Sequence, residues 1–233
     1  MLIVLDEVAS TMERAHLLAE AGAAAGQAVM ARRQRAGRGR QGRAWSAEPG
    51  GLWLSVICRP DGSRGLDALS LRIGLAVAVA VEQQCSALPR LGLKWPNDLL
   101  LEGRKLAGLL CEARWQGDRC AWVVVGLGLN VTNPLPPELA SRATRLADGI
   151  ADPPAPEHLP LPLTDPITAA GTGGPLAHEE LAAWTVRDAL RGHPVTRPQE
   201  GIADGITADG ALLVRDPDGI RHECRGGVVA ITD

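Results

Sequence analysis

Arginine and glycine alternate within one short segment of the chain. Residues 32–43 carry six Arg and no acidic residue, and Gly37, Gly39 and Gly42 lie among them. Arginine offers planar, permanently charged donors for phosphate or carboxylate, while glycine lets backbone amides approach a bound group closely. The formal net charge is −3, so the segment places positive charge on an otherwise acidic body. It predicts a binding site for a compact polyanion such as a nucleotide.

Two other interpretations of this loop stay open: a solvated basic loop, and an RGG-like segment that binds nucleic acid. A DNA-binding surface normally spreads over a face and raises the isoelectric point. Here the isoelectric point is about 6.0 and only one loop is basic. No GxxxxGK[ST] motif is present, so the loop is not a P-loop. GLGLN at 126–130 resembles a dinucleotide-binding fingerprint, but prolines follow it where a helix should start.

Lysine is as scarce as arginine is common. Only Lys94 and Lys105 are lysines among 24 basic residues, which indicates that a compact ammonium group is needed there. Asp98 precedes Lys105 by seven residues, across a turn that the WPND sequence favours. The alternative is an ordinary hairpin with a surface lysine, an interpretation that suits Asn97 better than Lys105.

Three glycines interrupt apolar runs that are typical of strands. They are Gly108, Gly126 and Gly128. A glycine weakens a strand unless a ligand or another backbone must approach it closely. We therefore expect a ligand to lie against this part of the sheet.

Hydrophobic periodicity predicts the elements that position these segments. Ser10 as N-cap and Glu13 three residues later form a capping box, so a helix should begin at Ser10 and stop at Gly22. Length favours a buried helix over 66–85. The remaining strands are expected at 2–5, 28–32, 51–59 and 91–131, the last group containing an antiparallel hairpin that turns at QGDR.

The second half of the chain has a different character. Residues 133–175 hold most of the 17 prolines, which predicts a long irregular or partly mobile segment. An amphipathic helix should follow over 177–191, and short strands separated by turns should begin at 193. These strands form a unit too small to be stable alone. We therefore expect two domains, residues 1–190 and residues 191–233.

Composition excludes several classes of protein. The chain has 233 residues, of which 45% are apolar and 22% charged, so it should form a globular core without a disulfide or metal. The five cysteines have no zinc-site spacing and suggest buried thiols in a reducing compartment. The N-terminus lacks the basic start of a signal peptide, and the longest apolar run has nine residues. We expect a soluble cytoplasmic protein.

Five motifs occur together in the order and spacing found in biotin protein ligases. They are Ser10-Thr11, QRAGRGRQGRAW at 34–45, KWPND at 94–98, RKLAG at 104–108 and GLGLN at 126–130. The similarity is strong over residues 8–132, weak over 133–190, and resumes over 195–233. The resemblance implies an α+β fold, in which helices flank a mixed β-sheet and a small SH3-like β-barrel follows at the C-terminus.

The resemblance also implies an activity. Biotin protein ligases are ATP-dependent enzymes that activate biotin as biotinyl-5′-AMP and transfer it to a lysine of a biotin carboxyl carrier protein. ATP with its Mg²⁺ and biotin would be bound, with no metal ion of the protein's own. Because the first motif starts at residue 10, we expect a monofunctional ligase without the DNA-binding domain. It would be a monomer or homodimer that binds neither nucleic acid nor membrane.

Roles for individual residues follow from the same resemblance. Arg38, Lys105 and Asp98 are the catalytic candidates, and Asp98 would orient or help deprotonate the acceptor lysine. Contacts to biotin are expected from Ser10, Thr11, Met12, Gln34, Arg38, Gly39, Arg40, Lys105, Gly108, Gly126 and Gly128. Contacts to ATP are expected from Arg38, Arg40, Trp45, Lys94, Asn97, Lys105 and Asn130. Met12 stands where the family usually has Asn, a residue that contacts the biotin ring.

Two alternative functions remain. Lipoate or octanoate ligases and transferases share the fold, but they would lack the GRGRxGR loop in this form. A nucleic-acid-binding module that uses the arginine loop is the alternative from a different class.

Overall fold

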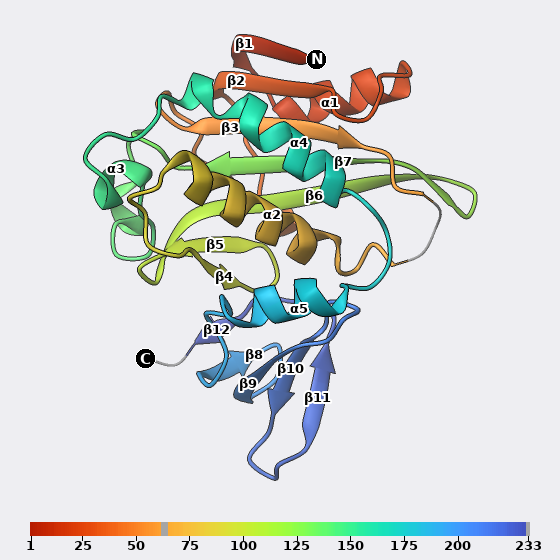
Figure 1. Cartoon of the computed structure of the whole chain (residues 1–233), viewed down its shortest axis with the longest axis vertical. Coiled ribbons are helices and arrows are strands. Elements are labelled where there is room, and N and C mark those ends of the chain that lie inside the picture. Colours follow the sequence, from red (N-terminus) through yellow and green to blue (C-terminus); the bar gives the residue numbers. More distant parts are fainter. Residues whose placement is uncertain (62–64, 232–233) are drawn as a thin grey trace.

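The computed structural model describes residues 1–61 and 65–231. A mixed sheet of seven strands forms its centre, in the order β1-β2-β3-β7-β6-β5-β4 (Figure 1). The first pair is parallel because a helix connects its strands, and every other neighbouring pair is antiparallel. The strands are β1 (Leu2–Val8), β2 (Ala28–Gln34), β3 (Leu52–Cys58), β4 (Gly92–Lys94), β5 (Asp98–Leu101), β6 (Arg104–Gln116) and β7 (Arg119–Leu129).

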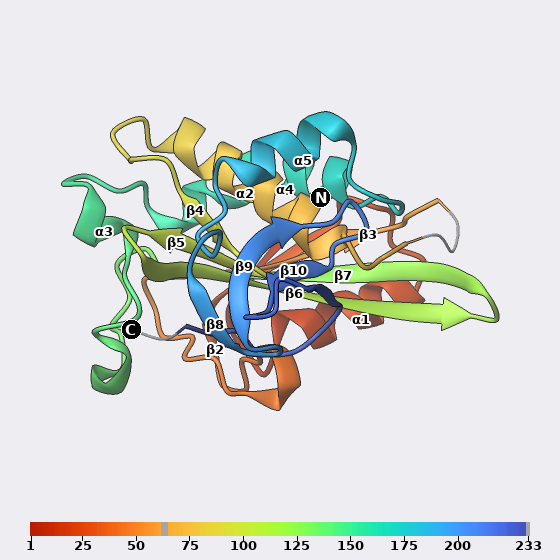
Figure 2. The ribbon, with the colours of Figure 1, turned by 90° about the horizontal axis from the view of Figure 1, so that it is seen from below.

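Helices cover both faces of this sheet. α2 (Leu69–Gln84) and α4 (Pro160–Ala170) lie on one face, and α1 (Thr11–Glu20) lies on the other (Figure 2). The strand β3 is buried along its whole length because it is sandwiched between these layers. Its alternate residues Leu52, Leu54 and Val56 join the large core under α2 and α4, whereas Ile57 joins the smaller core under α1. The expected α+β class with a mixed sheet flanked by helices is confirmed.

The Pro-rich segment is more regular than its composition predicts. The expectation of an irregular segment over 133–175 is wrong for its last third, because α4 occupies Pro160–Ala170. Pro160 and Pro162 lie in the first helical turn, where backbone N–H groups have no intrahelical partner to lose. The segment also contains α3 (Leu146–Gly149) and two short 3₁₀ turns, at Pro137–Leu139 and Pro156–His158.

The helix expected over 177–191 is shorter than predicted. α5 spans His178–Thr185, because the residues that follow it pair with the sheet instead of continuing the helix. The Leu93 N–H donates to the Arg187 carbonyl at 2.7 Å, and the Ala189 N–H donates to the Leu93 carbonyl at 2.9 Å. Arg187 also binds both carboxylate oxygens of Glu82 on α2. The chain is thus fixed to the sheet and to α2 just before it enters the C-terminal unit.

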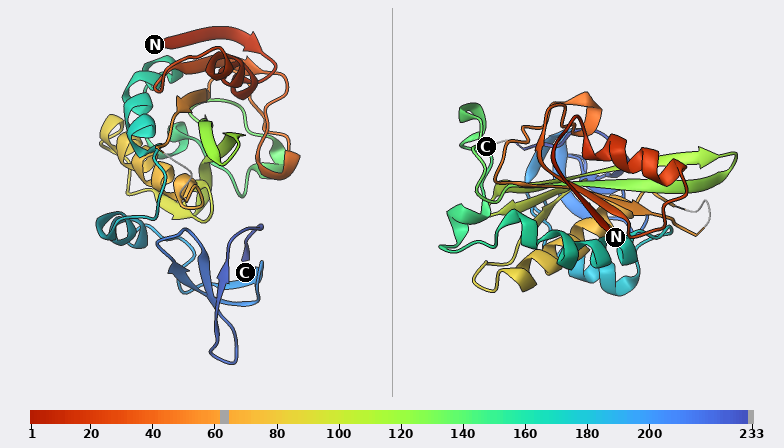
Figure 3. Two further views of the ribbon diagram at one scale, coloured as in Figure 1. Left: turned by 90° about the vertical axis from the view of Figure 1, so that its right-hand side faces the viewer. Right: turned by 90° about the horizontal axis from the view of Figure 1, so that it is seen from above.

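The C-terminal unit is a five-stranded antiparallel sheet in the order β11-β10-β9-β8-β12. Its strands are β8 (Pro194–Arg197), β9 (Gly201–Ile206), β10 (Leu212–Arg215), β11 (Arg221–Cys224) and β12 (Ala230–Ile231). Across residues 1–61 and 65–231, no pairing joins β11 to β12, so the expected barrel does not close. The unit lies beside α5 and the β4–β5 end of the large sheet (Figures 1 and 3). No helix of the described chain is long and apolar enough to cross a bilayer.

Candidate active site

The arginine loop leaves the end of β2 and returns toward β3. Two isolated bridges, Gln34 to Ala47 and Arg38 to Ala44, hold its two sides together. Its tip is a short 3₁₀ turn over Arg40–Gly42, in which Gln41 has φ 59° and Gly42 has φ 71°. Glycine tolerates such left-handed geometry, which explains one glycine of the motif. The loop is therefore a folded hairpin-like segment.

The six arginines of the loop do not act as one charged patch. The first three, two of which lie in β2 itself, pair with acidic side chains, half of them on β1: Arg32 with Asp6 and Glu157, Arg33 with Glu7 and Glu48, and Arg35 with Glu7. Arg43 donates to the Arg40 carbonyl at 3.4 Å. Arg38 pairs with Glu13, so among the described residues only Arg40 and Arg43 of the six lack a carboxylate partner, and the positive charge available to a ligand lies at the tip of the loop.

Two of the three strand glycines lie side by side under an indole ring. Gly108 on β6 pairs with Gly128 on β7, and Trp45 from the loop lies across both. A Cβ atom on Gly128 would lie 2.7 Å from Trp45 Cε2, and one on Gly108 would lie 3.2 Å from Trp45 Cζ3. Any side chain on Gly128 would displace the ring, so this glycine makes room for Trp45 or for a ligand between the ring and the sheet. The Trp45 Nε1 atom is buried, and among the described residues it has no hydrogen-bond partner, so it is a donor that a ligand could satisfy.

The scarce lysine Lys105 lies at the end of this glycine strip. Its ammonium pairs with the carboxylate of Asp98 at 2.5 Å, and it lies 5.2 Å from the centre of the Trp45 ring. The turn that brings Asp98 and Lys105 together is Glu102-Gly103 between β5 and β6, not the KWPND segment between β4 and β5, and the register pairs Asp98 with both Lys94 and Gly108. Asp98 and Lys105, which are seven residues apart in the sequence, are therefore in direct contact. Burial lowers the pKa of Lys94, an effect that Asp98 opposes and Lys105 reinforces.

Arg40 reaches the same turn from the opposite side. Its guanidinium donates to Asn97 Oδ1 at 3.3 Å, and Asn97 Nδ2 donates to the Leu109 carbonyl at 2.6 Å. Partial burial lowers the pKa of Arg40, with Asp98 acting in the opposite direction. The structure therefore brings Arg40, Asn97, Asp98 and Lys105 together around one end of the glycine strip.

A second polar group lies where α1 begins. The backbone N–H and the hydroxyl of Thr11 both donate to Gln34 Oε1, at 2.8 and 3.0 Å. The Thr11 hydroxyl also contacts the hydroxyl of Ser55 at 2.8 Å. Because Oε1 already accepts two hydrogen bonds, the amide orientation of Gln34 is fixed and its Nε2 donor faces away from Thr11.

Ser55 is the member of this network that sequence reasoning missed. It is fully buried in the middle of β3, in the run LWLSVIC. A single hydroxyl in an otherwise apolar buried strand was the available signal, since a buried polar group needs a partner. The apolar residues at 52, 54, 56 and 58 predict the buried face of the strand, and Ser55 lies on the opposite face.

The predicted capping box is wrong. Ser10 is the N-cap residue of α1 and is buried, but its side chain makes no capping hydrogen bond. Glu13 instead accepts a hydrogen bond from Arg38 at 2.9 Å. The Glu13 carboxylate binds the guanidinium of Arg38 instead of a backbone N–H, because charge-assisted hydrogen bonds are the stronger ones.

The third strand glycine accommodates Met12. A Cβ atom on Gly126 would lie 2.7 Å from Met12 Sδ. Met12 is itself buried and belongs to the small core between α1 and the sheet, with Ala15 and Ile57. Met12, packed against Gly126, therefore contributes its thioether and a close-packed apolar surface to the site.

Two of the expected residues lie differently from the rest. Asn130 is buried behind the strip, where its Nδ2 donates to the Thr144 carbonyl at 3.1 Å and its Oδ1 accepts from Asn133 at 3.2 Å. Both ends of its amide are occupied within the protein. Gly39 precedes the loop tip, and its N–H donates to the Arg43 carbonyl at 2.8 Å, which supports the loop from within.

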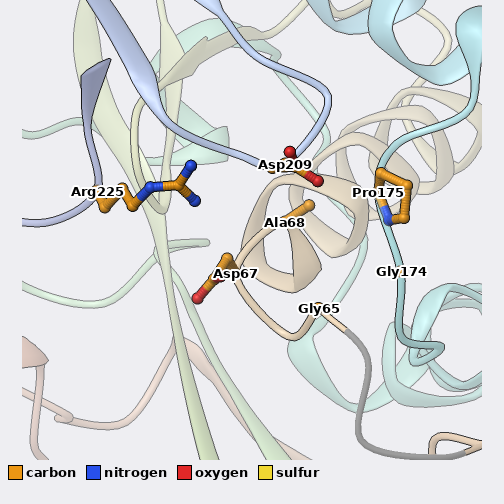
Figure 4. A pocket seen from close by; sticks show the side chains of 7 residues that line it. All are labelled: Gly65, Asp67, Ala68, Gly174, Pro175, Asp209 and Arg225. Atoms are coloured by element: carbon orange, nitrogen blue, oxygen red, sulfur yellow. The ribbon is translucent and has the colours of Figure 1, made fainter. Parts of the chain in front are cut away.

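A separate hollow of about 190 Å³ lies between the start of α2 and the C-terminal unit (Figure 4). Asp67, Asp209 and Arg225 are its charged side chains, and none of the expected site residues lines it. The nearby Trp95 Nε1 donates to the Gly210 carbonyl at 2.9 Å. This bond joins the KWPND turn to the C-terminal unit, so the unit is held close to the candidate site.

Carboxylates are scarce among the expected site residues, where Asp98 alone is acidic. Within residues 1–61 and 65–231, no three His, Cys, Asp or Glu side chains gather as metal ligands. The acidic group nearest the strip, Asp98, is paired with Lys105. A divalent ion at this site would need ligands that arrive with the substrate.

Comparisons with known proteins agree with this geometry. A family model described as "Biotin/lipoate A/B protein ligase family" matches residues 4–130. The biotin–[acetyl-CoA-carboxylase] ligase of Paracoccus denitrificans is 33% identical over 222 residues, which cover 82% of this chain and 85% of that protein. The bifunctional ligase/repressor BirA of Bacillus subtilis is 38% identical over 156 residues, covering 65% of this chain. The match spans about half of that relative's length, 47%.

Solved structures extend the similarity to the whole chain. The biotin protein ligase from Aquifex aeolicus in complex with biotin and ATP superposes with a TM-score of 0.82 and 29% identity. The match covers 99% of this chain and 98% of that one, so it includes the C-terminal unit. A family match over more than half of the chain and a relative aligned over most of it lead to one conclusion. The chain belongs to the biotin/lipoate A/B protein ligase family.

Proposed function

We propose that the protein is an ATP-dependent biotin protein ligase that biotinylates a lysine of a biotin carboxyl carrier protein. The observation that carries this proposal is the Lys105 ammonium, which lies over Trp45 at the end of the Gly108–Gly128 strip. An apolar ligand with a terminal carboxylate fits such an arrangement. The names of the relatives and the complex of the Aquifex aeolicus ligase with biotin and ATP support the choice of biotin over lipoate.

In the first step, a carboxylate oxygen of biotin attacks the α-phosphorus of ATP. The bond to pyrophosphate breaks, and biotinyl-5′-AMP forms. The carboxylate is already ionised at neutral pH, so the barrier comes from the meeting of two anions and not from a missing base. Lys105, Arg40 and Arg38 supply the opposing charge, together with backbone amides near Gly39. Mg²⁺ enters as a companion of ATP and neutralises part of the phosphate charge.

The polar group at the start of α1 binds the ring end of biotin in this proposal. Thr11 and Ser10 contribute hydroxyls, and Gln34 offers its Nε2 donor, which the bonds to Oε1 hold in place. Met12, Gly126, Gly108 and Gly128 form the apolar wall along the body of the ligand. Trp45 covers the adenylate, and Lys94 and Asn97 complete the nucleotide side of the site. Asn130, whose amide is bonded to Thr144 and Asn133, supports the site without touching the nucleotide.

In the second step, the acceptor lysine attacks the carbonyl carbon of biotinyl-5′-AMP, and AMP leaves. A lysine with a pKa of about 10.4 must first lose a proton, which costs roughly 4.6 kcal/mol at pH 7. Asp98 orients this amine or accepts its proton. The Lys105 ammonium holds the Asp98 carboxylate in place.

The larger arrangement follows from the same proposal. Residues 1–190 form the catalytic domain, and residues 191–233 form a small β domain that lies against the KWPND turn. The protein acts in the cytoplasm as a monomer or homodimer, without nucleic acid or membrane. ATP is a cytoplasmic substrate, and the five free cysteines suit a reducing compartment.

Transfer of radiolabelled biotin to a purified carrier domain tests this function. The wild-type protein should label one carrier lysine in an ATP-dependent reaction. Lys105→Ala should lower the rate by about 10²–10³, the usual cost of removing one such donor. The neighbouring variant Arg104→Ala removes the same charge at a residue that pairs with Leu101, three positions along β5 from Asp98, and should label normally. Failure of the folded wild-type protein to label any carrier would overturn the proposal.

A further inference from the structure

Arg38 is held apart from the other cations of the proposed site. Its guanidinium donates to Glu13 Oε1 at 2.9 Å, in the first turn of α1. Arg40 and Lys105, in contrast, contact the neighbouring residues Asn97 and Asp98 on the KWPND turn. Three cations that should meet one anionic ligand are therefore divided between two places.

The place that Arg38 occupies is an open hollow beside α1. The hollow has a volume of about 360 Å³ and is lined by Glu13, His16, Leu17, Glu20, Arg38, Arg114 and Trp122. Arg114 and Arg38 both lower the pKa of His16, after the larger effect of burial. Arg38 thus lies among other basic groups here, and the Glu13 carboxylate is its direct ion-pair partner.

No structural role of Glu13 in α1 explains its contact with Arg38. It does not complete a capping box with Ser10, and about half of its side chain is exposed. Its carboxylate is chemically the same kind of group as the carboxylate of the proposed ligand. A ligand carboxylate that binds Arg38 must therefore displace Glu13 from the guanidinium.

We propose that Glu13 is a positioning residue that holds Arg38 outside the ligand site and thereby lowers the affinity for the anionic ligand. This inference rests on the proposed function, because it takes biotin as that ligand. An exposed ion pair of this kind shifts an equilibrium by about two- to five-fold. Glu13 therefore acts as an internal competitor with a modest and measurable effect.

Calorimetric titration with biotin tests the proposal. Glu13→Gln should bind biotin about two- to five-fold more tightly than the wild type. The matched control is Glu20→Gln, which makes the same change of charge in the same hollow at a residue without an ion pair in the described structure. It should bind biotin as the wild type does. Equal or weaker binding by Glu13→Gln would overturn the proposal.

The Arg38→Ala background separates competition from a general structural effect. If Glu13 acts through Arg38, Glu13→Gln should leave biotin affinity unchanged once Arg38 is absent. A gain of the same size in both backgrounds would show that Glu13 acts in another way, and the proposal would fail. In steady-state assays with the wild-type Arg38, the KM for biotin should fall while kcat stays constant.

A readout without ligand distinguishes failure of this inference from failure of the proposed function. Trypsin cleavage after Arg38, mapped by mass spectrometry, should be faster in Glu13→Gln than in Glu20→Gln, because the guanidinium is no longer held. If the wild type binds no biotin, the proposed function fails, and the cleavage rates still decide whether Glu13 holds Arg38. Equal cleavage in the two variants would contradict that role.

Discussion

Lys105 contacts two groups of different kinds, the Asp98 carboxylate and the face of the Trp45 ring. The carboxylate fixes the ammonium by charge, and the ring faces it with the negative side of its quadrupole. An arginine at this position would be planar and longer, and it could not fit both groups as a compact ammonium does. In a chain that uses arginine almost everywhere, this geometry explains why a lysine occurs here.

Asp98 should matter more for transfer than for activation. Asp98→Asn keeps the shape of the side chain but removes the group that orients or deprotonates the acceptor amine. We expect transfer from preformed biotinyl-5′-AMP to fall by about 10²–10⁴, the usual contribution of a general base. Adenylate formation should fall much less, since Trp45 still contacts Lys105. Single-turnover transfer and ATP–pyrophosphate exchange measure the two steps, and equal losses in both would exclude this role.

Ser55 should act on biotin binding through Thr11. Ser55→Ala removes one buried hydrogen bond and leaves Thr11 free to turn away from Gln34, so the KM for biotin should rise about ten-fold with little change in kcat. Thr164→Ala is a suitable control, because Thr164 is also buried but bonds only to the Pro160 carbonyl within α4. An unchanged KM for Ser55→Ala would mean that the network does not position the ligand contacts.

Among the elements, those with strong local signals were predicted well and those fixed by distant contacts were not. The strand β3 follows from apolar periodicity, and the helix α2 follows from the length of its apolar run. The end of α5 at Thr185 does not, because it depends on hydrogen bonds from Leu93 to the following residues. The capping box failed for the same reason, since Arg38 lies 25 residues from Glu13 and takes its carboxylate.

The contact that ends α5 should make stability depend on pH. Burial alone would raise the pKa of Glu82, but Arg187 and the Leu91 N–H lower it below its ordinary value. A depressed pKa means that this contribution to stability is present above the unfolded-state pKa of about 4.3 and is lost as pH falls through the folded-state pKa. Glu82→Gln should cost about 2 kcal/mol at pH 7.

Thermal denaturation between pH 7 and pH 3 checks this effect. The wild type and Glu82→Gln should differ at pH 7, and their melting temperatures should converge below about pH 4. A difference that stays constant down to pH 3 would rule out the charge of Glu82 as its cause.

Considered as a whole molecule, the protein consists of a site-bearing sheet and a small β unit whose buried residues Val195, Ile206 and Leu212 join the same apolar core as the sheet. The KWPND turn connects the two, because Trp95 bonds to Gly210 while Asp98 pairs with Lys105. The sequence motifs predicted the residues of the proposed site and their order along the chain. They could not show that Trp95 serves the interface, because its partner is a backbone carbonyl 115 residues away.

Gly210 should be essential for this docking. It has φ +87°, and a Cβ atom on it would lie 2.8 Å from Ala68 Cα. Gly219 provides the control, since it has φ +84° with nothing within 4 Å. Both Gly→Ala variants should lose about 1 kcal/mol from backbone strain, and Gly210→Ala should lose roughly 1–3 kcal/mol more from the clash. Equal unfolding free energies in denaturant titrations would show that the interface tolerates the added methyl group.

Biotin-dependent exchange between ATP and pyrophosphate tests the central claim most directly, because it reports only the reaction between the carboxylate and the α-phosphate. The wild-type protein should catalyse exchange when biotin is added and not when lipoate is added, and Lys105→Ala should reduce the exchange rate by about 10²–10³. The account would be contradicted if a folded wild-type protein showed no exchange with biotin, or if Lys105→Ala exchanged at the wild-type rate.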